Sequence, residues 1–417
     1  MRMPFSSRAC TINAAAVGLL LLSAMGVQAA TRCPGRQWLG VWATSPSDGT
    51  GPTFTNQTLR LVVHPTYRGR QVRLRLSNRY GGQAVSFGAV AIARRLAGAD
   101  VVPRSTRVVL FADQASVTIP AGGEVVSDPL RFRVRAFEDV AVSMYVTTSG
   151  SASEHVGALQ TSYVSAAGSG DHTTDEAGGA FTPAISGWPF LTDVEVRAAR
   201  RIGGVVALGD SITEGFPGPV DANGRYPDLL ARRITEVRGL RLAVQNAGIG
   251  GNSVLRDGLA VRFGPSLLDR LDADAIDQAG ARIVILMEGT NDLGLQPPAT
   301  SAQVIAGLQD AVDRLHLAGF RVILGTQAPC GDPALTHGSP AAIAARNEIN
   351  QWIRTADVAD AVVDFNAVLR DPANPDRLLP AFDSGDHLHP SAAGYQAMAD
   401  AVDLPNLADP PCLPPSE

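Results

Sequence analysis

The chain has 417 residues, of which 45% are hydrophobic and 18% charged, and its formal net charge is −5. This length allows two domains with well-buried cores, and the composition excludes a disordered chain. A mildly acidic chain without a basic stripe has no electrostatic footprint for nucleic acid. All 35 basic residues are arginine. The absence of lysine excludes Ser–Lys dyads, Schiff-base lysines and phosphate-loop lysines.

The first thirty residues have the pattern of a secretory signal peptide. Arg2 and Arg8 supply a positive start, residues 14–27 form an apolar stretch, and small residues precede a cleavage point near Ala29 or Ala30. The apolar stretch is short for a bilayer span, and no later segment is long and apolar enough to cross a membrane. We therefore expect a secreted or periplasmic protein with no stable membrane insertion after cleavage. Its oligomeric state stays open.

Cysteine usage agrees with export. Cys10 would leave with the signal, and Cys33, Cys330 and Cys412 would remain in an oxidising compartment. Three residues imply one disulfide and one free thiol, and three pairings are open. A bond between Cys33 and Cys412, which would join the two ends of the mature chain, is favoured.

The first half of the chain is expected to be all-β. Short β-branched runs, several of them alternating, are separated by glycine- and proline-containing turns, and no amphipathic helix interrupts them. The expected strands cover residues 57–64, 71–76, 85–91, 108–111, 117–119 and 140–146. This pattern favours an antiparallel, jelly-roll-like sandwich, followed by a loop or linker over residues 165–182.

From about Val194 the pattern alternates between strands and helices. Buried-type strands are expected at residues 202–208, 242–245, 283–287, 322–326 and 361–364, and helices at 226–238, 301–317, 341–355 and from Ser391. This alternation predicts a parallel sheet covered on both faces. Sites in such sheets lie at the carboxyl ends of the strands.

Two glycine-rich segments follow the first two of these strands. Ser211 lies in Gly-Asp-Ser-Ile-Thr-Glu-Gly at residues 209–215, where a serine at a helix amino terminus is held beside backbone N–H groups that favour an anion. The same pattern also fits a simple helix cap. The second segment, 246–253, reads Asn-Ala-Gly-Ile-Gly-Gly-Asn-Ser, and its glycines allow a close approach to a ligand. Its spacing does not fit a dinucleotide loop.

Polar residues also follow the third strand and precede the last helix. Asn291 lies in Gly-Thr-Asn-Asp, where it could cap a helix or aim its amide at an oxyanion. Asp386 and His389 are three residues apart on a loop, so that one can orient the other. Asp383 and His387 lie close by but do not have this spacing. A metal site at these histidines is the alternative, although no further histidine or cysteine cluster supports it.

Together, in this order, these segments resemble the four signature blocks of the SGNH/GDSL hydrolase family over residues 202–402. The resemblance implies a three-layer, flavodoxin-like α/β fold with a five-stranded parallel sheet. It implies a catalytic triad of Ser211, Asp386 and His389. It also implies an oxyanion hole formed by the backbone N–H groups of Ser211 and Gly251 and the side chain of Asn291. No cofactor or metal is implied. The first half is similar to β-domains attached to some exported bacterial members.

We therefore expect a signal peptide at 1–30, a β-sandwich domain at 31–185 and a hydrolase domain at 186–417. The leading hypothesis is a secreted esterase that hydrolyses short-chain carboxylic esters, small or polymeric, through an acyl-enzyme; deacetylation of a polysaccharide is one version. The alternatives are a lysophospholipase or lipase, a carbohydrate-binding protein with an inert hydrolase domain, and a metal-dependent hydrolase. For the β-domain, a wall of the catalytic cleft is favoured over sugar binding because this half is aromatic-poor.

Overall fold

The computed structural model describes Met1, residues 35–258 and residues 261–408. The expected signal peptide and the expected Cys33–Cys412 pairing lie outside the described residues, and they stay predictions. Cys330 is buried with a free thiol. In the parts of the chain just given, no helix combines the length and the apolar character that a membrane span requires.

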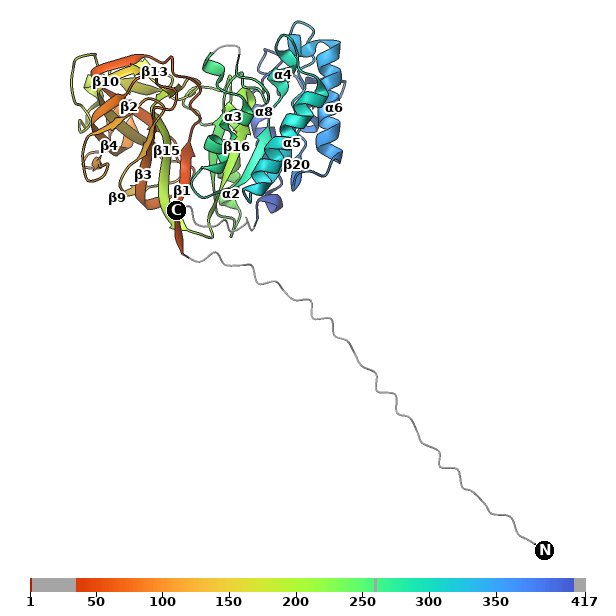
Figure 1. Ribbon diagram of the computed structural model, residues 1–417, viewed down its shortest axis with the longest axis horizontal. Coiled ribbons are helices and arrows are strands. Elements are labelled where there is room, and N and C mark those ends of the chain that lie inside the picture. Colours follow the sequence, from red (N-terminus) through yellow and green to blue (C-terminus); the bar gives the residue numbers. More distant parts are fainter. Residues whose placement is uncertain (2–34, 259–260, 409–417) are drawn as a thin grey trace. The chain divides into compact units, whose positions relative to one another are not determined.

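Two antiparallel sheets form the first half of the described chain (Figure 1). The first has the order β1-β15-β3-β8, with β9 also paired to β3. The second has the order β13-β12-β2-β10-β4-β5, with β6 and β7 also paired to β4. The strands are β1 (Arg36–Ala43), β2 (Thr53–Val63), β3 (Gly69–Ser77), β4 (Val85–Ala97), β5 (Asp100–Val101), β6 (Arg107–Val109), β7 (Val117–Ile119), β8 (Glu124–Val126), β9 (Leu130–Val134), β10 (Val140–Ser151), β12 (Ser162–Val164), β13 (Ala184–Ile185) and β15 (Leu191–Ala199). A separate pair joins β11 (Glu154–His155) to β14 (Trp188–Pro189).

One hydrophobic core lies between the two sheets. It contains Leu74 of β3 and Val194 of β15 from the first sheet, and Leu61 of β2 and Val142 of β10 from the second. Side chains that alternate along each strand point into this core, which is the arrangement of a sandwich. The prediction of an antiparallel sandwich is confirmed, and every strand expected in this half overlaps an observed one.

The expected boundary between residues 185 and 186 falls inside the sandwich. β15 pairs with β1 and with β3, so the first sheet extends through Ala199. The expected linker at 165–182 is likewise a loop between strands of the sandwich, with one turn of 3₁₀-helix at η1 (Gly178–Ala180). Asp193, Glu195 and Arg197 alternate with Val194, Val196 and Ala198 along β15, which is the pattern of an antiparallel strand, and the sequence analysis expected no strand at this place.

The second half contains the expected five-stranded parallel sheet. Its strands are β16 (Gly203–Gly209), β17 (Leu242–Gly248), β18 (Ala281–Met287), β19 (Arg321–Gly325) and β20 (Ala361–Val363), in the order β17-β16-β18-β19-β20. This is the flavodoxin-like order, in which the second strand lies outside the first. The chain therefore switches direction across the sheet beside β16, and the crevice at this point is where such folds bind ligands.

Helices cover both faces of this sheet (Figure 1). Val205 and Ala207 of β16 point into a core with α2, α7 and α8, whereas Val206 and Leu208 point into a core with α3, α5 and α6. The helices are α1 (Ser211–Glu214), α2 (Tyr226–Glu236), α3 (Leu267–Leu271), α4 (Thr290–Gly294), α5 (Ser301–Leu317), α6 (Pro340–Thr355), α7 (Phe365–Leu369) and α8 (Ala392–Ala401). Short elements are η2 (Val261–Phe263), η3 (Asp272–Ile276), η4 (Thr336–Gly338), η5 (Leu404–Leu407) and the hairpin of β21 (Arg370–Asp371) and β22 (Asn374–Leu378).

The sandwich covers the outer edge of the parallel sheet. β17 is the edge strand, and at Val244 its N–H and its C=O both point to the hydroxyl of Thr66. Oγ1 of Thr66 donates to the C=O of Val244 at 2.8 Å and accepts from its N–H at 3.0 Å. Both residues are buried. One side chain of the sandwich therefore replaces the partner strand that β17 lacks at this position.

This contact predicts a difference between two substitutions of Thr66. Thr66→Val keeps the shape but leaves two buried backbone groups of Val244 without a partner, and it should lower the free energy of unfolding by about 1–3 kcal/mol. Thr66→Ser keeps the hydroxyl and should cost less. Urea unfolding of both variants measures the difference. A valine variant at least as stable as the serine variant would contradict the account.

Candidate functional site

Ser211 begins the short helix α1 directly after β16, at the carboxyl edge of the parallel sheet. Asp210 is the N-cap, and its Oδ1 accepts the N–H of Ile212 at 2.9 Å. Asp210 is buried, and this burial raises its pKa to about 7. Both readings of the segment therefore hold, because Asp210 caps the helix while Ser211 presents its hydroxyl at the helix amino terminus.

The loop before α8 brings His389 and Asp386 to this serine. Nε2 of His389 lies 2.8 Å from Oγ of Ser211, and Nδ1 of His389 lies 2.6 Å from Oδ2 of Asp386. Oδ1 of Asp386 accepts the backbone N–H groups of Leu388 and His389. Partial burial opposes ionisation of Asp386, but its hydrogen bonds to the backbone and ring of His389 lower its pKa to about 2. The ionised carboxylate fixes the proton on Nδ1, which leaves Nε2 to accept the serine proton.

Asp383 and His387 form a separate pair on the same loop. Oδ2 of Asp383 lies 2.6 Å from Nδ1 of His387, and Oδ1 accepts the N–H groups of Gly385 and His387. The side chain of His387 is more than half exposed, and the hydrogen bond to Asp383 raises its pKa. Asp383 therefore shapes the turn, and neither residue contacts Ser211.

The expected oxyanion groups lie at three strand ends. Gly251 follows β17 with φ of +75°, and a Cβ there would come within 2.4 Å of the ring of Phe263. Nδ2 of Asn291, in α4 after β18, donates to the C=O of Asn252 at 2.7 Å. An asparagine amide has a second N–H. Within the described ranges, neither that second N–H nor the backbone N–H groups of Ser211 and Gly251 donate to a protein acceptor. These donors are therefore available to a ligand.

Arg270 of α3 is hydrogen-bonded to the backbone at two of these strand ends, β16 and β17. It is fully buried and donates to the C=O of Gly209 at 2.9 Å, to the C=O of Ala247 at 2.7 Å and to Oδ1 of Asn252 at 2.8 Å. It also pairs with Asp274 at 3.0 Å. Glu288, at the end of β18, lies 3.7 Å away, and its own burial together with nearby Asp210 raises its pKa well above the usual range. The sequence analysis missed Arg270, because nothing in its surroundings distinguishes it from a surface arginine.

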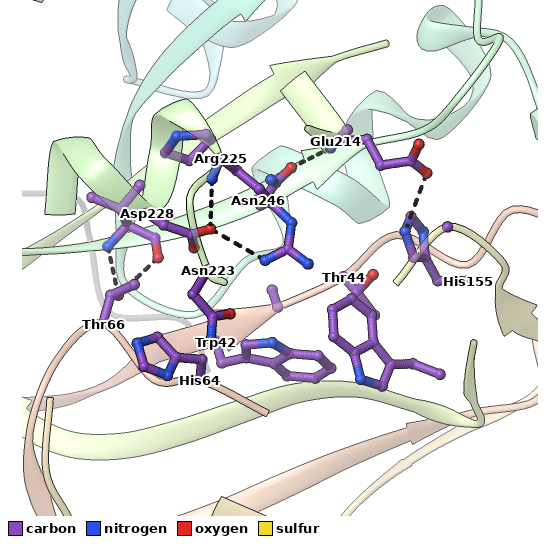
Figure 2. Close-up of a pocket in the computed structure, with 16 residues that line it drawn as sticks. Trp42, Thr44, His64, Thr66, His155, Glu214, Asn223, Arg225, Asp228 and Asn246 are labelled. Atoms are coloured by element: carbon purple, nitrogen blue, oxygen red, sulfur yellow. Dashed lines mark hydrogen bonds and ion pairs between the residues drawn. The ribbon is translucent and has the colours of Figure 1, made fainter. Parts of the chain in front are cut away.

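A second contact missed by the sequence analysis joins the nucleophile helix to the sandwich. Figure 2 shows Glu214 of α1 pointing at His155 of β11 in a pocket between the two halves. Oε1 of Glu214 lies 3.4 Å from Nε2 of His155, whose Nδ1 donates to the C=O of Ser45 at 2.8 Å. Burial raises the pKa of Glu214 to about 7 and lowers the pKa of His155 to about 4. At neutral pH His155 is therefore uncharged, and Glu214 is close to the midpoint of its ionisation.

The described side chains that could bind a metal ion do not form a cluster. In residues 35–258 and 261–408, no three histidine, cysteine, aspartate or glutamate side chains are placed to hold one metal ion.

Comparison with known proteins gives a family for part of the chain. Residues 207–397 match the model of the GDSL-like lipase/acylhydrolase family. No curated protein sequence matches the chain.

Solved structures with a similar fold include three hydrolases. A lipase/acylhydrolase from Enterococcus faecalis is 24% identical, with 52% of this chain and 99% of that chain covered and a TM-score of 0.40. A GDSL-like lipase from Bacteroides thetaiotaomicron is 19% identical, with 50% and 88% covered and a TM-score of 0.38. An acetyl xylan esterase is 21% identical, with 48% and 96% covered and a TM-score of 0.37.

The two aspartates of the loop should respond differently to substitution. Asp386→Asn removes the carboxylate that fixes the His389 tautomer, and in other serine hydrolases such a change costs about ten-thousandfold in turnover. Asp383→Asn keeps an oxygen acceptor for its turn and should cost less than tenfold. Ester hydrolysis by the two purified variants measures this. Equal losses, or a larger loss at Asp383, would contradict the assignment.

The raised pKa of Glu214 predicts a pH-dependent stability. The unfolded chain ionises Glu214 near 4.5 and the folded chain near 7, so its contribution to stability is complete below pH 4.5 and is lost as the pH rises through 7. A glutamine cannot ionise, so the Glu214→Gln variant does not lose this stability as the pH rises. The free energy of unfolding of the variant, relative to wild type, should therefore rise by about 3 kcal/mol between pH 4.5 and 8.

Urea unfolding at both pH values tests this prediction. Glu236→Gln, an exposed acid on α2, is the matched control and should give no such change. A difference for Glu214→Gln that stays constant with pH would show that the pair with His155 does not titrate as described.

Proposed function

Residues 207–397 of this chain form a domain of the GDSL-like lipase/acylhydrolase family, and from this premise we propose that the protein is an exported serine esterase acting on short-chain carboxylic esters. One observation carries the proposal. Ser211, His389 and Asp386 form a continuous hydrogen-bonded chain, with distances of 2.8 and 2.6 Å, at the carboxyl edge of the sheet. This is the arrangement that activates a serine nucleophile.

In the proposed reaction, Nε2 of His389 takes the proton of Ser211 as Oγ attacks the ester carbonyl. The negative charge that develops on the carbonyl oxygen is stabilised by the N–H groups of Ser211 and Gly251 and by the amide of Asn291. Each such donor contributes about 3 kcal/mol in comparable hydrolases. His389 then gives its proton to the leaving alcohol, and water cleaves the acyl-enzyme by the reverse sequence.

Within this proposal the sandwich serves as structural support for the catalytic domain rather than as a sugar-binding surface. Trp42 and Trp188 are buried in the sandwich core. The ring of Trp38 carries the guanidinium groups of Arg73 at 4.5 Å and of Arg197 at 5.6 Å from its centroid. Two of these three rings are therefore buried, and the third already packs against arginine side chains instead of standing free for a pyranose face. Deacetylation of a polysaccharide and lysophospholipase activity stay as narrower alternatives for the substrate.

Substitution of the nucleophile is the primary test. Ser211→Ala should lower hydrolysis of a short-chain ester by at least about ten-thousandfold, because no acyl-enzyme can form. The matched control is Ser384→Ala, an exposed serine on the His389 loop, which should retain wild-type turnover. Circular dichroism and the melting temperature establish that both variants are folded.

Three results would contradict the proposal. The nucleophile assignment fails if Ser211→Ala keeps more than a few per cent of wild-type turnover. A preference for long acyl chains over acetyl and butyryl esters would favour a lipase. Loss of activity in EDTA that zinc restores would favour the metal-dependent alternative at His387 and His389.

A further inference from the structure

A partly exposed aromatic ring lies against the proposed catalytic histidine. Phe216 is 45% exposed, and its ring packs edge-to-face on His389 with the centroids 5.0 Å apart. It begins the loop of residues 216–224, which connects α1 to α2 and also exposes Val220 at 58%. Phe216 therefore places a partly exposed apolar ring beside the site.

The start of the 216–224 loop is fixed by the hydrolase domain. The N–H of Phe216 donates to the C=O of Ser211 at 3.0 Å, and the hydroxyl of Tyr395 in α8 donates to the C=O of Phe216. Tyr395 is buried. The backbone of Phe216 is thus tied to the nucleophile helix and to the helix that follows His389.

The far end of the loop is held by the sandwich, through Asp221. Its Oδ1 accepts from Nε2 of Gln160 at 2.5 Å and from the N–H of Thr161 at 2.6 Å, and its Oδ2 accepts from the hydroxyl of Thr161 at 2.8 Å. The N–H of Asp221 donates to the C=O of Leu159 at 3.0 Å. One carboxylate therefore receives three hydrogen bonds from a single sandwich segment, residues 157–161.

Residues 157–161 are themselves held in position by contacts of Ala158. Ala158 is fully buried in the sandwich core, and its N–H donates to the C=O of Ser186 at 3.0 Å. Its C=O accepts from Nη2 of Arg225, the residue that ends the loop and caps α2. Asp221 and Leu159 both have positive φ, at +65° and +47°. Such conformations cost energy in residues other than glycine and persist where surrounding contacts determine them.

The position of Phe216 determines which half of an ester it would meet. His389 must give its proton to the leaving oxygen, so the alcohol lies within hydrogen-bonding reach of Nε2. The oxyanion donors Gly251 and Asn291 follow other strands, β17 and β18. The ring of Phe216, which packs on the imidazole, therefore faces the alcohol half of the ester. An aromatic ring binds best to a partner with an apolar face.

We propose that Phe216 contacts the alcohol half of the substrate and selects alcohols with an apolar face about the size of a ring. We further propose that residues 157–161 of the sandwich act as a positioning segment for this contact, through Asp221. Both statements rest on the proposed function, because they take His389 as the proton carrier.

The first test varies the alcohol and the acyl group separately. The probes are methyl acetate, benzyl acetate and methyl hexanoate. For Phe216→Ala, the ratio of kcat/KM for benzyl acetate over methyl acetate should fall about three- to tenfold, mainly through KM, because an aromatic contact is lost. The ratio for methyl hexanoate over methyl acetate should change less than twofold. Phe216→Tyr, which keeps the ring, should restore the benzyl preference.

Two results overturn the assignment of Phe216. A larger change in the hexanoate ratio would place the ring on the acyl side. Ratios that both stay at the wild-type values, with only a uniform loss of kcat, would mean that the ring supports His389 without contacting substrate.

The second test removes the sandwich contact. Asp221→Ala should lower the benzyl ratio in the same direction as Phe216→Ala, whereas Asp221→Asn, which tolerates positive φ and keeps one acceptor oxygen, should stay within about twofold of wild type. Thr161→Val removes only the hydroxyl that donates to Asp221, and it replaces Asp221→Ala in this test if that variant does not fold. The matched control is Asp128→Ala, which removes a half-buried sandwich carboxylate that accepts the N–H groups of Ala112 and Asp113.

A lower melting temperature with an unchanged benzyl ratio, for Asp221→Ala or for Thr161→Val, overturns the positioning role. So does an equal change in the ratio for Asp128→Ala. Failure of this inference is distinguishable from failure of the proposed function. The ratios compare substrates within one active enzyme, whereas the proposed function is tested by Ser211→Ala, by the acyl-chain preference and by EDTA treatment.

Discussion

The geometry of the site depends on one buried guanidinium. Arg270 holds the carbonyl groups at the ends of β16 and β17 and the side chain of Asn252, so that the serine segment and the glycine segment are fixed to one rigid group. Its charge is balanced by Asp274 beside it, with Glu288 close by. Removal of one partner from such a buried network leaves the others uncompensated, which is strongly destabilising. The donors for an oxyanion are therefore preorganised by a residue that would not touch the substrate.

The sequence predicted the elements well where local pattern decides them. The five parallel strands and helices α2, α5, α6 and α8 all lie where periodicity indicated, and the order of the strand-end segments indicated the family. β15 fell on the wrong side of the expected boundary, because no strand was expected over residues 191–199 and its partners β1 and β3 lie far earlier in the chain. Arg270, His155 and Asp221 were not predicted. Their hydrogen bonds to the strand ends, within the sandwich and between the two halves join residues 18 to 110 positions apart, and no local pattern encodes these.

Three of the contacts between the sandwich and the hydrolase half are of different kinds. Thr66 satisfies the backbone of β17, His155 meets Glu214 on the nucleophile helix, and residues 157–161 hold the loop that carries Phe216. The last two of these come from one short stretch of the sandwich. The first half is thus linked to the site by polar contacts, in addition to the apolar packing of Ala243 of β17 in the sandwich core.

The Thr66 contact also bears on association between molecules through sheet edges. An open parallel sheet ends in a row of unpaired N–H and C=O groups, and such an edge can pair with the same edge of another molecule. In this chain the strand at risk, β17, is shielded by residues synthesised nearly two hundred positions earlier. The last strand of the sandwich ends at Ala199 and β17 begins at Leu242, so a chain that emerges amino terminus first presents the cover before the strand that it shields.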